Sequence, residues 1–294
     1  MPALDRRAQR DAATPGRIEP RAHVKCVVAR SGTSFLWGMQ ALPRARRRAM
    51  YAIYAFCREV DDIADEPGAL DDKLRALAAW REEIARLYDG RPARPTALAL
   101  LEPVRRFGLP QEEFLAVIDG MESDARPSVR MPTMDDLLSY CRKVAGAVGM
   151  LSIHAFGASH QPGPRFAVAL GNAFQLTNIL RDLGEDARLE RLYVPLATLA
   201  EHGVAPRAPA AVLADPGFAG ACAELAALAR GYYAEAERLR ARLGWRQTRP
   251  PVLMMAVYRE TLDRLEQRGW SRLDVPVRVT RGRKIWLALR HGLL

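Results

Sequence analysis

Apolar residues recur at intervals of three and four along most of the chain, the spacing that places them on one face of an α-helix. The pattern is clearest in residues 71–88 (DDKLRALAAWREEIARLY), 220–243 and 252–267. Alternation of apolar and polar residues, which would indicate half-buried strands, is hard to find. The sequence therefore predicts an all-α protein.

Clusters of proline and glycine punctuate this pattern and mark where helices begin and end. They leave no long linker that would separate two domains, and no internal repeat of fixed period is visible. We expect one domain over residues 23–294, built of roughly ten or more helices. The clusters lie at 67–68, 90–95, 108–110, 127–132, 162–164, 203–209 and 244–251.

The first 22 residues, MPALDRRAQRDAATPGRIEPRA, mix arginine, aspartate, proline and glycine without any apolar periodicity. They also lack the uninterrupted apolar stretch of a secretory signal peptide. We expect residues 1–22 to form a disordered tail.

The composition excludes several kinds of protein. Apolar residues make up 49% of the 294, enough for a continuous core, yet no stretch approaches the roughly 18–20 apolar residues of a membrane span. The four cysteines form no CxxC pair, and the five histidines show no zinc-binding spacing. We expect a reduced, cytoplasmic setting.

The formal net charge of +10 suits nucleic acid, anionic lipid or a small polyanionic substrate. No nucleic-acid-binding signature accompanies the basic residues, so we expect no nucleic-acid partner. The last segment, 281–294 (RGRKIWLALRHGLL), has the composition of a helix that lies on an anionic bilayer. Plain packing on the domain is the favoured interpretation, and peripheral contact with the inner membrane is the alternative.

A first acidic cluster, Asp61, Asp62 and Asp65, follows a strongly apolar run. On a helix Asp61 and Asp65 share one face, while Asp62 and Asp65 are an alternative pair. Either pair can hold a hard cation, and without a cation or an arginine the like charges repel. A solvated helix end near Pro67 is the other interpretation.

A second cluster places Asn178, Asp182 and Asp186 four residues apart, with Gln175 nearly one turn earlier. These side chains would share one helical stripe, and carboxylate and amide oxygens suit Mg²⁺, which is completed by water and substrate phosphates. Gly184 is expected to interrupt the helix just before Asp186.

Arginines accompany both clusters and could neutralise a diphosphate together with metal ions, although each could equally pair with its acidic neighbour. The helices that carry the clusters are otherwise apolar and aromatic, which suits either an amphiphilic substrate or an ordinary core. The arginines are Arg58, Arg181, Arg188 and Arg191, and the aromatic residues include Phe35, Trp37, Tyr51, Tyr54, Phe56 and Phe174.

Four segments resemble the squalene and phytoene synthase family: SGTSF at 31–35, YAIYAFCREVDDIAD at 51–65, YCRKVAGAVG at 140–149 and QLTNILRDLGEDARLERLYVP at 175–195. The resemblance runs from about Ser31 to Trp286. Within the family, the sequence of the N-terminal motif at 39–68 most resembles the bacterial enzymes of hopanoid and squalene pathways that make presqualene diphosphate.

The resemblance implies an isoprenoid-synthase α-fold in which the two acidic clusters face each other across a central cavity and bind Mg²⁺, with Mn²⁺ as an alternative. The implied metal ligands are Asp61, Asp65, Asn178, Asp182 and Asp186. Diphosphate contacts are implied for Arg58, Arg181 and Tyr193, and substrate-cavity positions for Ser34, Phe35, Tyr54, Tyr140, Gln175 and Tyr258. A phosphate-binding arginine near the C-terminus is left unassigned among Arg278, Arg281 and Arg283.

The implied reaction is head-to-head condensation of two farnesyl diphosphates to presqualene diphosphate, without NADPH. Phytoene, dehydrosqualene, hydroxysqualene and squalene are products of other branches, and a C20 substrate and the proton acceptor stay open. Two further classes remain as alternatives: a terpene cyclase acting on one diphosphate, and a basic helical protein that binds a membrane surface or nucleic acid. Oligomeric state is not readable from the sequence.

Overall fold

The structure is a computed structural model that describes residues 19–31, 39–40, 42–273 and 275–292. The helices of the first half are α1 (Pro20–Arg30), α3 (Arg44–Asp65), α4 (Leu70–Tyr88), α5 (Pro95–Phe107), α6 (Gln111–Asp124), α7 (Met134–Cys141), the π-helical turn η1 (Arg142–Gly146) and α8 (Ala147–Ala155). Those of the second half are α9 (Gly163–Arg188), α10 (Leu196–Glu201), α11 (Pro209–Leu213), α12 (Phe218–Arg240), α13 (Trp245–Arg268) and α14 (Arg281–Gly292). The all-α prediction is confirmed.

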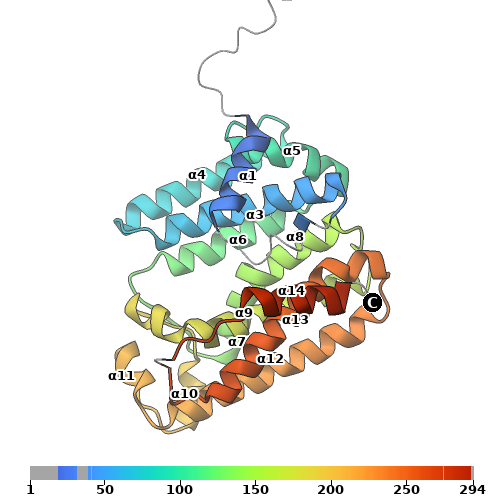
Figure 1. Ribbon diagram of the computed structural model, residues 1–294. Helices are drawn as coiled ribbons and strands as arrows, with labels where there is room; N and C mark the ends of the chain where they lie inside the picture. Colours follow the sequence, from blue (N-terminus) through green and yellow to red (C-terminus); the bar gives the residue numbers. More distant parts are fainter. Residues whose placement is uncertain (1–18, 32–38, 41, 274, 293–294) are drawn as a thin grey trace, which may run out of the picture.

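Two groups of helices lie one above the other, each around its own apolar core (Figure 1). In the upper group, α1, α3–α6 and α8, the ring of Phe56 meets Trp80 and Phe114 edge-on, with centroids 5.3 and 5.1 Å apart. The lower core is built mainly from α7, α9, α12 and α13. Val144 of η1 packs against both cores, so the two groups form one continuous domain.

A close approach between α9 and η1 joins the two groups. A Cβ on Gly171 of α9 would lie 2.8 Å from the Cα and N of Gly146 and 2.9 Å from the carbonyl carbon of Ala145. Real Cβ atoms do not approach backbone this closely, so only glycine allows the two segments to touch at this point. The π-helical turn, a rare form that occurs often at functional sites, is thereby held against the middle of α9.

Three helix boundaries differ from those that the sequence predicts. Helix α1 begins at Pro20, with Glu19 accepting from the amide of Ala22, so residues 20–22 of the predicted tail are helical; residues 1–18 lie outside the described residues. Helix α9 runs unbroken through Gly184 because burial of Leu180 and Leu183 outweighs the roughly 1 kcal/mol that glycine costs a helix.

The third difference is that α13 begins at Trp245 and contains Pro250 and Pro251 inside the helix. Each proline removes one backbone donor and normally marks a boundary. Burial of Leu262 and Leu265 further along the same helix favours continuation, so the cluster at 244–251 is a poor guide to the helix start.

One short parallel ladder pairs β1 (Val129–Arg130) with β2 (Arg191–Leu192), the only strands in the described part of the chain. It places Arg191, which follows α9, beside the end of α6. Helix α14 packs on α13 with Leu287 buried. Across the residues that the structure describes, no helix has both the length and the apolar character needed to cross a bilayer.

Candidate active site

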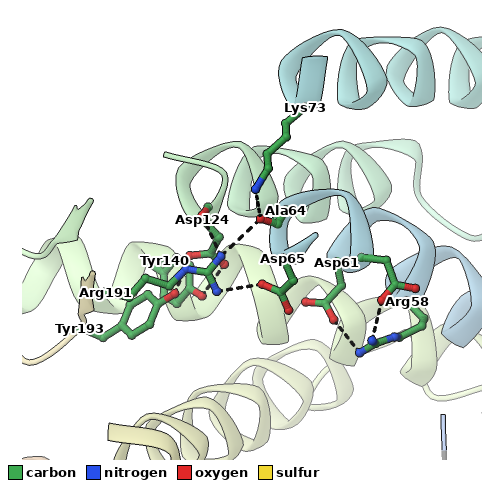
Figure 2. Close-up of polar contacts among 10 residues, drawn as sticks. Arg58, Asp61, Ala64, Asp65, Lys73, Asp124, Tyr140, Arg191 and Tyr193 are labelled. Carbon is green, nitrogen blue, oxygen red and sulfur yellow. Dashed lines mark hydrogen bonds and ion pairs between the residues drawn. The ribbon is translucent and has the colours of Figure 1, made fainter. Parts of the chain in front are cut away.

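The first acidic cluster lies on the last turn of α3, which ends at Asp65. Asp61 and Asp65 lie one turn apart, as predicted, and Arg58 lies one turn before Asp61 (Figure 2). The guanidinium of Arg58 donates to Asp61 Oδ2 over 3.1 Å and pairs with Asp62 over 2.5 Å. Arg58 therefore pairs with its acidic neighbours in this structure, which is one of the two interpretations given above, the other being diphosphate binding.

The second acidic cluster lies on α9, whose continuity through Gly184 keeps Gln175, Asn178, Asp182 and Asp186 on one helix. Arg181 binds Asp182 through two hydrogen bonds, Nε to Oδ1 at 2.7 Å and Nη2 to Oδ2 at 2.5 Å. The Oδ1 atom of Asn178 is buried and has no hydrogen-bond partner among the described residues. A buried oxygen without a donor is the kind of atom that a cation would satisfy.

The carboxylates of the two clusters are short of positive charge. Burial, and next the charge of Asp65, raise the pKa of Asp61 from 3.8 to about 6. Burial, and next the charge of Asp182, raise the pKa of Asp186 to about 7. Asp124 at the end of α6 repels both, so α3, α6 and α9 bring acidic groups into one region.

No three acidic, histidine or cysteine side chains of the described residues lie close enough together to hold a metal ion by themselves. Mg²⁺ usually takes only one or two carboxylates from the protein and completes its shell with water and phosphate oxygens. Oxygen ligands, the unsatisfied Asn178 Oδ1 and the raised pKa values of Asp61 and Asp186 all fit residues that would hold a divalent cation.

The raised pKa values predict how the stability of the metal-free protein depends on pH. The folded protein keeps protons on Asp61, Asp124 and Asp186 up to about pH 6 or 7, whereas the unfolded chain releases them near 3.8. Stability contributed by this site therefore falls as pH rises from about 4 to about 7. Thermal unfolding in EDTA is expected to show this fall, and Mg²⁺ is expected to stabilise the protein more at about pH 8 than at about pH 5.

An Asp186→Asn variant isolates this contribution from that of the other carboxylates. Without the group whose pKa reaches about 7, the fall in melting temperature between about pH 5 and 7 should be smaller than in the unchanged protein. Equal slopes for the two proteins would contradict the electrostatic description of the site.

A buried cluster around Asp124 lies beside the first acidic cluster (Figure 2). The Asp124 carboxylate, 6% exposed, accepts the hydroxyl of Tyr140 at 2.8 Å and that of Tyr193 at 2.7 Å, and the two rings stack with centroids 4.9 Å apart. Arg191 reaches from β2 to Asp65 Oδ1 (2.8 Å) and to the backbone carbonyl of Asp124 (2.9 Å).

Sequence reasoning missed Asp124 and noted Arg191 only as one of several arginines. Asp124 ends α6 in the segment MESDAR, which carries no recognisable motif. Its one signal is its place among apolar residues: Met121 and Ala125 are buried on the same part of the helix, and a buried carboxylate needs partners.

An apolar cavity of about 230 Å³ opens beside α9. Its walls come from four regions: Met39, Leu42 and Met50; Val144, Ala145, Val148, Gly149, Ser152, Ile153 and Phe156; Phe166, Ala167, Leu170, Gly171, Phe174, Gln175 and Asn178; and Pro250, Pro251, Met254 and Tyr258. Phe174 and Tyr258 stack in its wall with centroids 4.3 Å apart. Gln175 and Asn178 belong to both the cavity wall and the second acidic cluster, so the polar site and the cavity adjoin.

The remaining predicted residues lie in different places. Gln175 and Tyr258 line the cavity, whereas Tyr140, also predicted for the cavity, and Tyr193, predicted to contact the diphosphate, bind Asp124. Tyr54 is half-buried against the upper core. Ser34 and Phe35 lie outside the described residues.

A single helical domain with two acidic helices beside an apolar cavity is the architecture of an isoprenoid synthase. Comparisons with known proteins support that class: the squalene/phytoene synthase family pattern matches residues 28–283. A crystal structure of a dehydrosqualene synthase superposes with a TM-score of 0.81, at 26% identity, covering 93% of this chain and 95% of the other.

Two curated relatives match over nearly their whole length. The presqualene diphosphate synthase of Sinorhizobium fredii is 42% identical, covering 95% of this chain and 99% of that protein. The presqualene diphosphate synthase of Rhodopseudomonas palustris is 39% identical, covering 96% and 99%. The chain therefore belongs to the squalene/phytoene synthase family, and membership implies magnesium-dependent chemistry on a prenyl diphosphate.

Proposed function

We propose that this protein condenses two molecules of farnesyl diphosphate head-to-head to presqualene diphosphate and releases one diphosphate. The observation that carries the proposal is the direct junction between the second acidic cluster and the apolar cavity, made by Gln175 and Asn178. Such a junction suits a substrate with a polar diphosphate at one end and an apolar prenyl chain at the other. Both curated relatives described above are named for this product, which supports the same assignment.

In this proposal the metal ligands are Asp61, Asp65, Asn178, Asp182 and Asp186, and the metal is Mg²⁺ or Mn²⁺. When bound, the cation supplies charge that stabilises the departing diphosphate. Arg58 and Arg181 would add guanidinium donors by giving up part of their pairing with Asp61, Asp62 and Asp182. The Tyr193 hydroxyl donates to Asp124, so its oxygen is left as an acceptor in this state.

The apolar cavity has two tasks in the proposed reaction. It holds the prenyl chains, with Tyr258 and Gln175 in its wall. It also excludes water while an allylic cation forms, is attacked by the second substrate's double bond and loses a proton to close the cyclopropane. On the family resemblance, substrate contacts are also proposed for Ser34, Phe35, Tyr54 and Tyr140. The catalytic domain is proposed to span residues 23–294 together with the first turn of α1.

The direct test is incubation of the purified protein with farnesyl diphosphate and Mg²⁺, with and without NADPH, and mass spectrometry of the lipid. A C30 monodiphosphate formed without NADPH supports the proposal. A C30 hydrocarbon or alcohol would assign the protein to a squalene or dehydrosqualene branch, and turnover of a C20 substrate alone would assign it to phytoene synthesis. A C15 hydrocarbon would favour a terpene cyclase.

Helix α14 is proposed to touch an anionic membrane surface. Leu287 is buried, whereas Ile285 and Leu289 on the opposite face and Trp286 beside it are 43%, 55% and 42% exposed. Arg290 lies over the Trp286 ring at 5.1 Å, so positive charge borders the exposed apolar side chains. In a symmetric contact with a second copy, these cations would face each other, whereas an anionic bilayer complements them.

Vesicle co-sedimentation checks this surface. Full-length protein is expected to bind vesicles that contain phosphatidylglycerol more strongly than neutral phosphatidylcholine vesicles, and Leu289→Glu is expected to weaken that binding. Leu74→Glu, on the exposed side of α4, is the matched control. Equal binding by all three proteins, or concentration-dependent dimerisation that Leu289→Glu abolishes, would contradict the membrane proposal.

A cytoplasmic location is proposed on the four unpaired cysteines.

A further inference from the structure

The guanidinium of Arg191 is fixed by oxygens from the ends of two helices. Its side chain is 10% exposed, and it donates to Asp65 Oδ1 (2.8 Å), the carbonyl of Asp124 (2.9 Å) and, more weakly, the carbonyl of Ala64 (3.5 Å). Asp124 and Ala64 lie in the last turns of α6 and α3, where backbone carbonyls lack helical partners and carry partial negative charge. Arg191 therefore ties the C-terminal ends of α3 and α6 together.

The anchor on the α6 side is rigid. Asp124 is buried, and each of its carboxylate oxygens accepts one tyrosine hydroxyl, from Tyr140 and from Tyr193. Arg191 lies on β2, and Tyr193 directly follows this strand, so the cluster holds Arg191 through both its side chain and the adjoining backbone. The carbonyl that holds Arg191 thus has little freedom to move.

The anchor at Asp65 is different. Its side chain is 43% exposed and it is the last residue of α3, so its carboxylate can rotate without breaking the helix. The neighbouring carbonyl of Ala64 also accepts from Lys73 Nζ at 2.8 Å, which holds the backbone while the side chain turns (Figure 2). Of the two ends of this bridge, Asp65 is the one that can change partner.

We propose that Arg191 is the internal counter-ion of Asp65 in the metal-free protein, and that Asp65 exchanges Arg191 for the metal–diphosphate complex, leaving Nη1 of Arg191 to donate to a diphosphate oxygen. The inference rests on the proposed function, because it needs a metal and a diphosphate at this site. Arg191 is then a positioning residue before the substrate arrives and a diphosphate ligand afterwards. A guanidinium suits both partners, since carboxylate and phosphate oxygens present similar geometry.

The exchange makes two effects of removing Arg191 opposite in sign. Without diphosphate, Arg191 competes with the cation for Asp65, so Arg191→Gln should bind Mn²⁺ more tightly, by about tenfold. With Mg²⁺ present, the same variant lacks one diphosphate donor and should bind inorganic pyrophosphate about tenfold more weakly. A residue that only supports the fold would weaken both.

The experiment measures Mn²⁺ binding by electron paramagnetic resonance and Mg²⁺-dependent pyrophosphate binding by calorimetry in the full-length protein. Arg191→Lys is the second variant and guards against loss of fold: it keeps the charge, but one nitrogen cannot span Asp65 and the Asp124 carbonyl. It should weaken pyrophosphate binding with a smaller gain in Mn²⁺ affinity. Arg75→Gln, an exposed residue of α4 paired with Asp72, controls for net charge and should match the unchanged protein in both measurements.

The outcomes separate this inference from the proposed function. If the wild-type protein binds neither Mn²⁺ nor pyrophosphate, the proposed function itself is contradicted. If it binds both, opposite shifts in Arg191→Gln support the counter-ion role. The counter-ion role would be overturned if Arg191→Gln lost affinity for both ligands or kept both affinities. It would also be overturned if Arg191→Lys bound both ligands as tightly as the wild-type protein.

Discussion

Replacing Asp182 with alanine is expected to reduce magnesium-dependent turnover by about a thousandfold or more, because transition-state charge on the diphosphate loses a metal-holding group. Asp182 lies at the centre of the second acidic cluster, between Asn178 and Asp186 on α9. The measurement is the rate of diphosphate release from farnesyl diphosphate at saturating Mg²⁺. Asp61→Ala, on helix α3, should give a loss of the same order.

The same substitution should leave the fold intact. The charge of Asp182 raises the pKa of Asp186, so its removal relieves repulsion in the metal-free protein. We therefore expect the melting temperature in EDTA to stay the same or to rise. Asp72→Ala, which removes an exposed aspartate of α4, is the matched control and should keep full turnover. Undiminished turnover in Asp182→Ala would show that the acidic cluster on α9 is not the catalytic metal site.

Replacing Gly171 with alanine is expected to lower the free energy of unfolding by about 1–3 kcal/mol, because the added Cβ would press on the backbone of η1. The contact atoms are Cα and N of Gly146 and the carbonyl carbon of Ala145, all within 2.9 Å, and backbone yields less than a flexible side chain. Turnover should fall as well, since Ala145 and Gly171 both line the cavity. Denaturant unfolding and steady-state kinetics measure the two effects.

Gly231→Ala, on the neighbouring helix α12, gives the opposite expectation for the same chemical change. Gly231 is exposed, and a Cβ there would meet no atom of the described residues within 4 Å, so alanine should raise the free energy of unfolding by about 0.5–1 kcal/mol through helix propensity. Equal effects at Gly171 and Gly231 would show that the close approach of α9 and η1 is not what sets the stability at this point.

The sequence predicted what depends on local periodicity. Apolar spacing gave the helices, and the four-residue intervals from Asn178 to Asp186 gave an acidic stripe that the structure keeps on one helix. The predicted interruption of the helix at Gly184 was wrong, because the local cost of glycine in a helix is outweighed by burial of Leu180 and Leu183. The helix boundary predicted from Pro250 and Pro251 was wrong for a similar reason, since both lie inside α13.

The parts of the site that the sequence did not predict depend on distant contacts. Asp124 accepts Tyr140 and Tyr193, which lie 16 and 69 residues further along the chain, and Arg191 reaches Asp65 across 126 residues. No local pattern encodes these pairings. The assignment of Tyr140 and Tyr193 came from family resemblance, and the structure adds that their hydroxyls are held by Asp124.

If two farnesyl diphosphates combine with loss of a single diphosphate, the ratio of diphosphate released to farnesyl diphosphate consumed must show this stoichiometry. The measurement uses purified protein and Mg²⁺ without NADPH, with both quantities followed in one reaction. One diphosphate released for every two farnesyl diphosphates consumed is the expected result. One diphosphate for each farnesyl diphosphate consumed, the ratio expected of a terpene cyclase or of onward conversion to a C30 product without diphosphate, would contradict it.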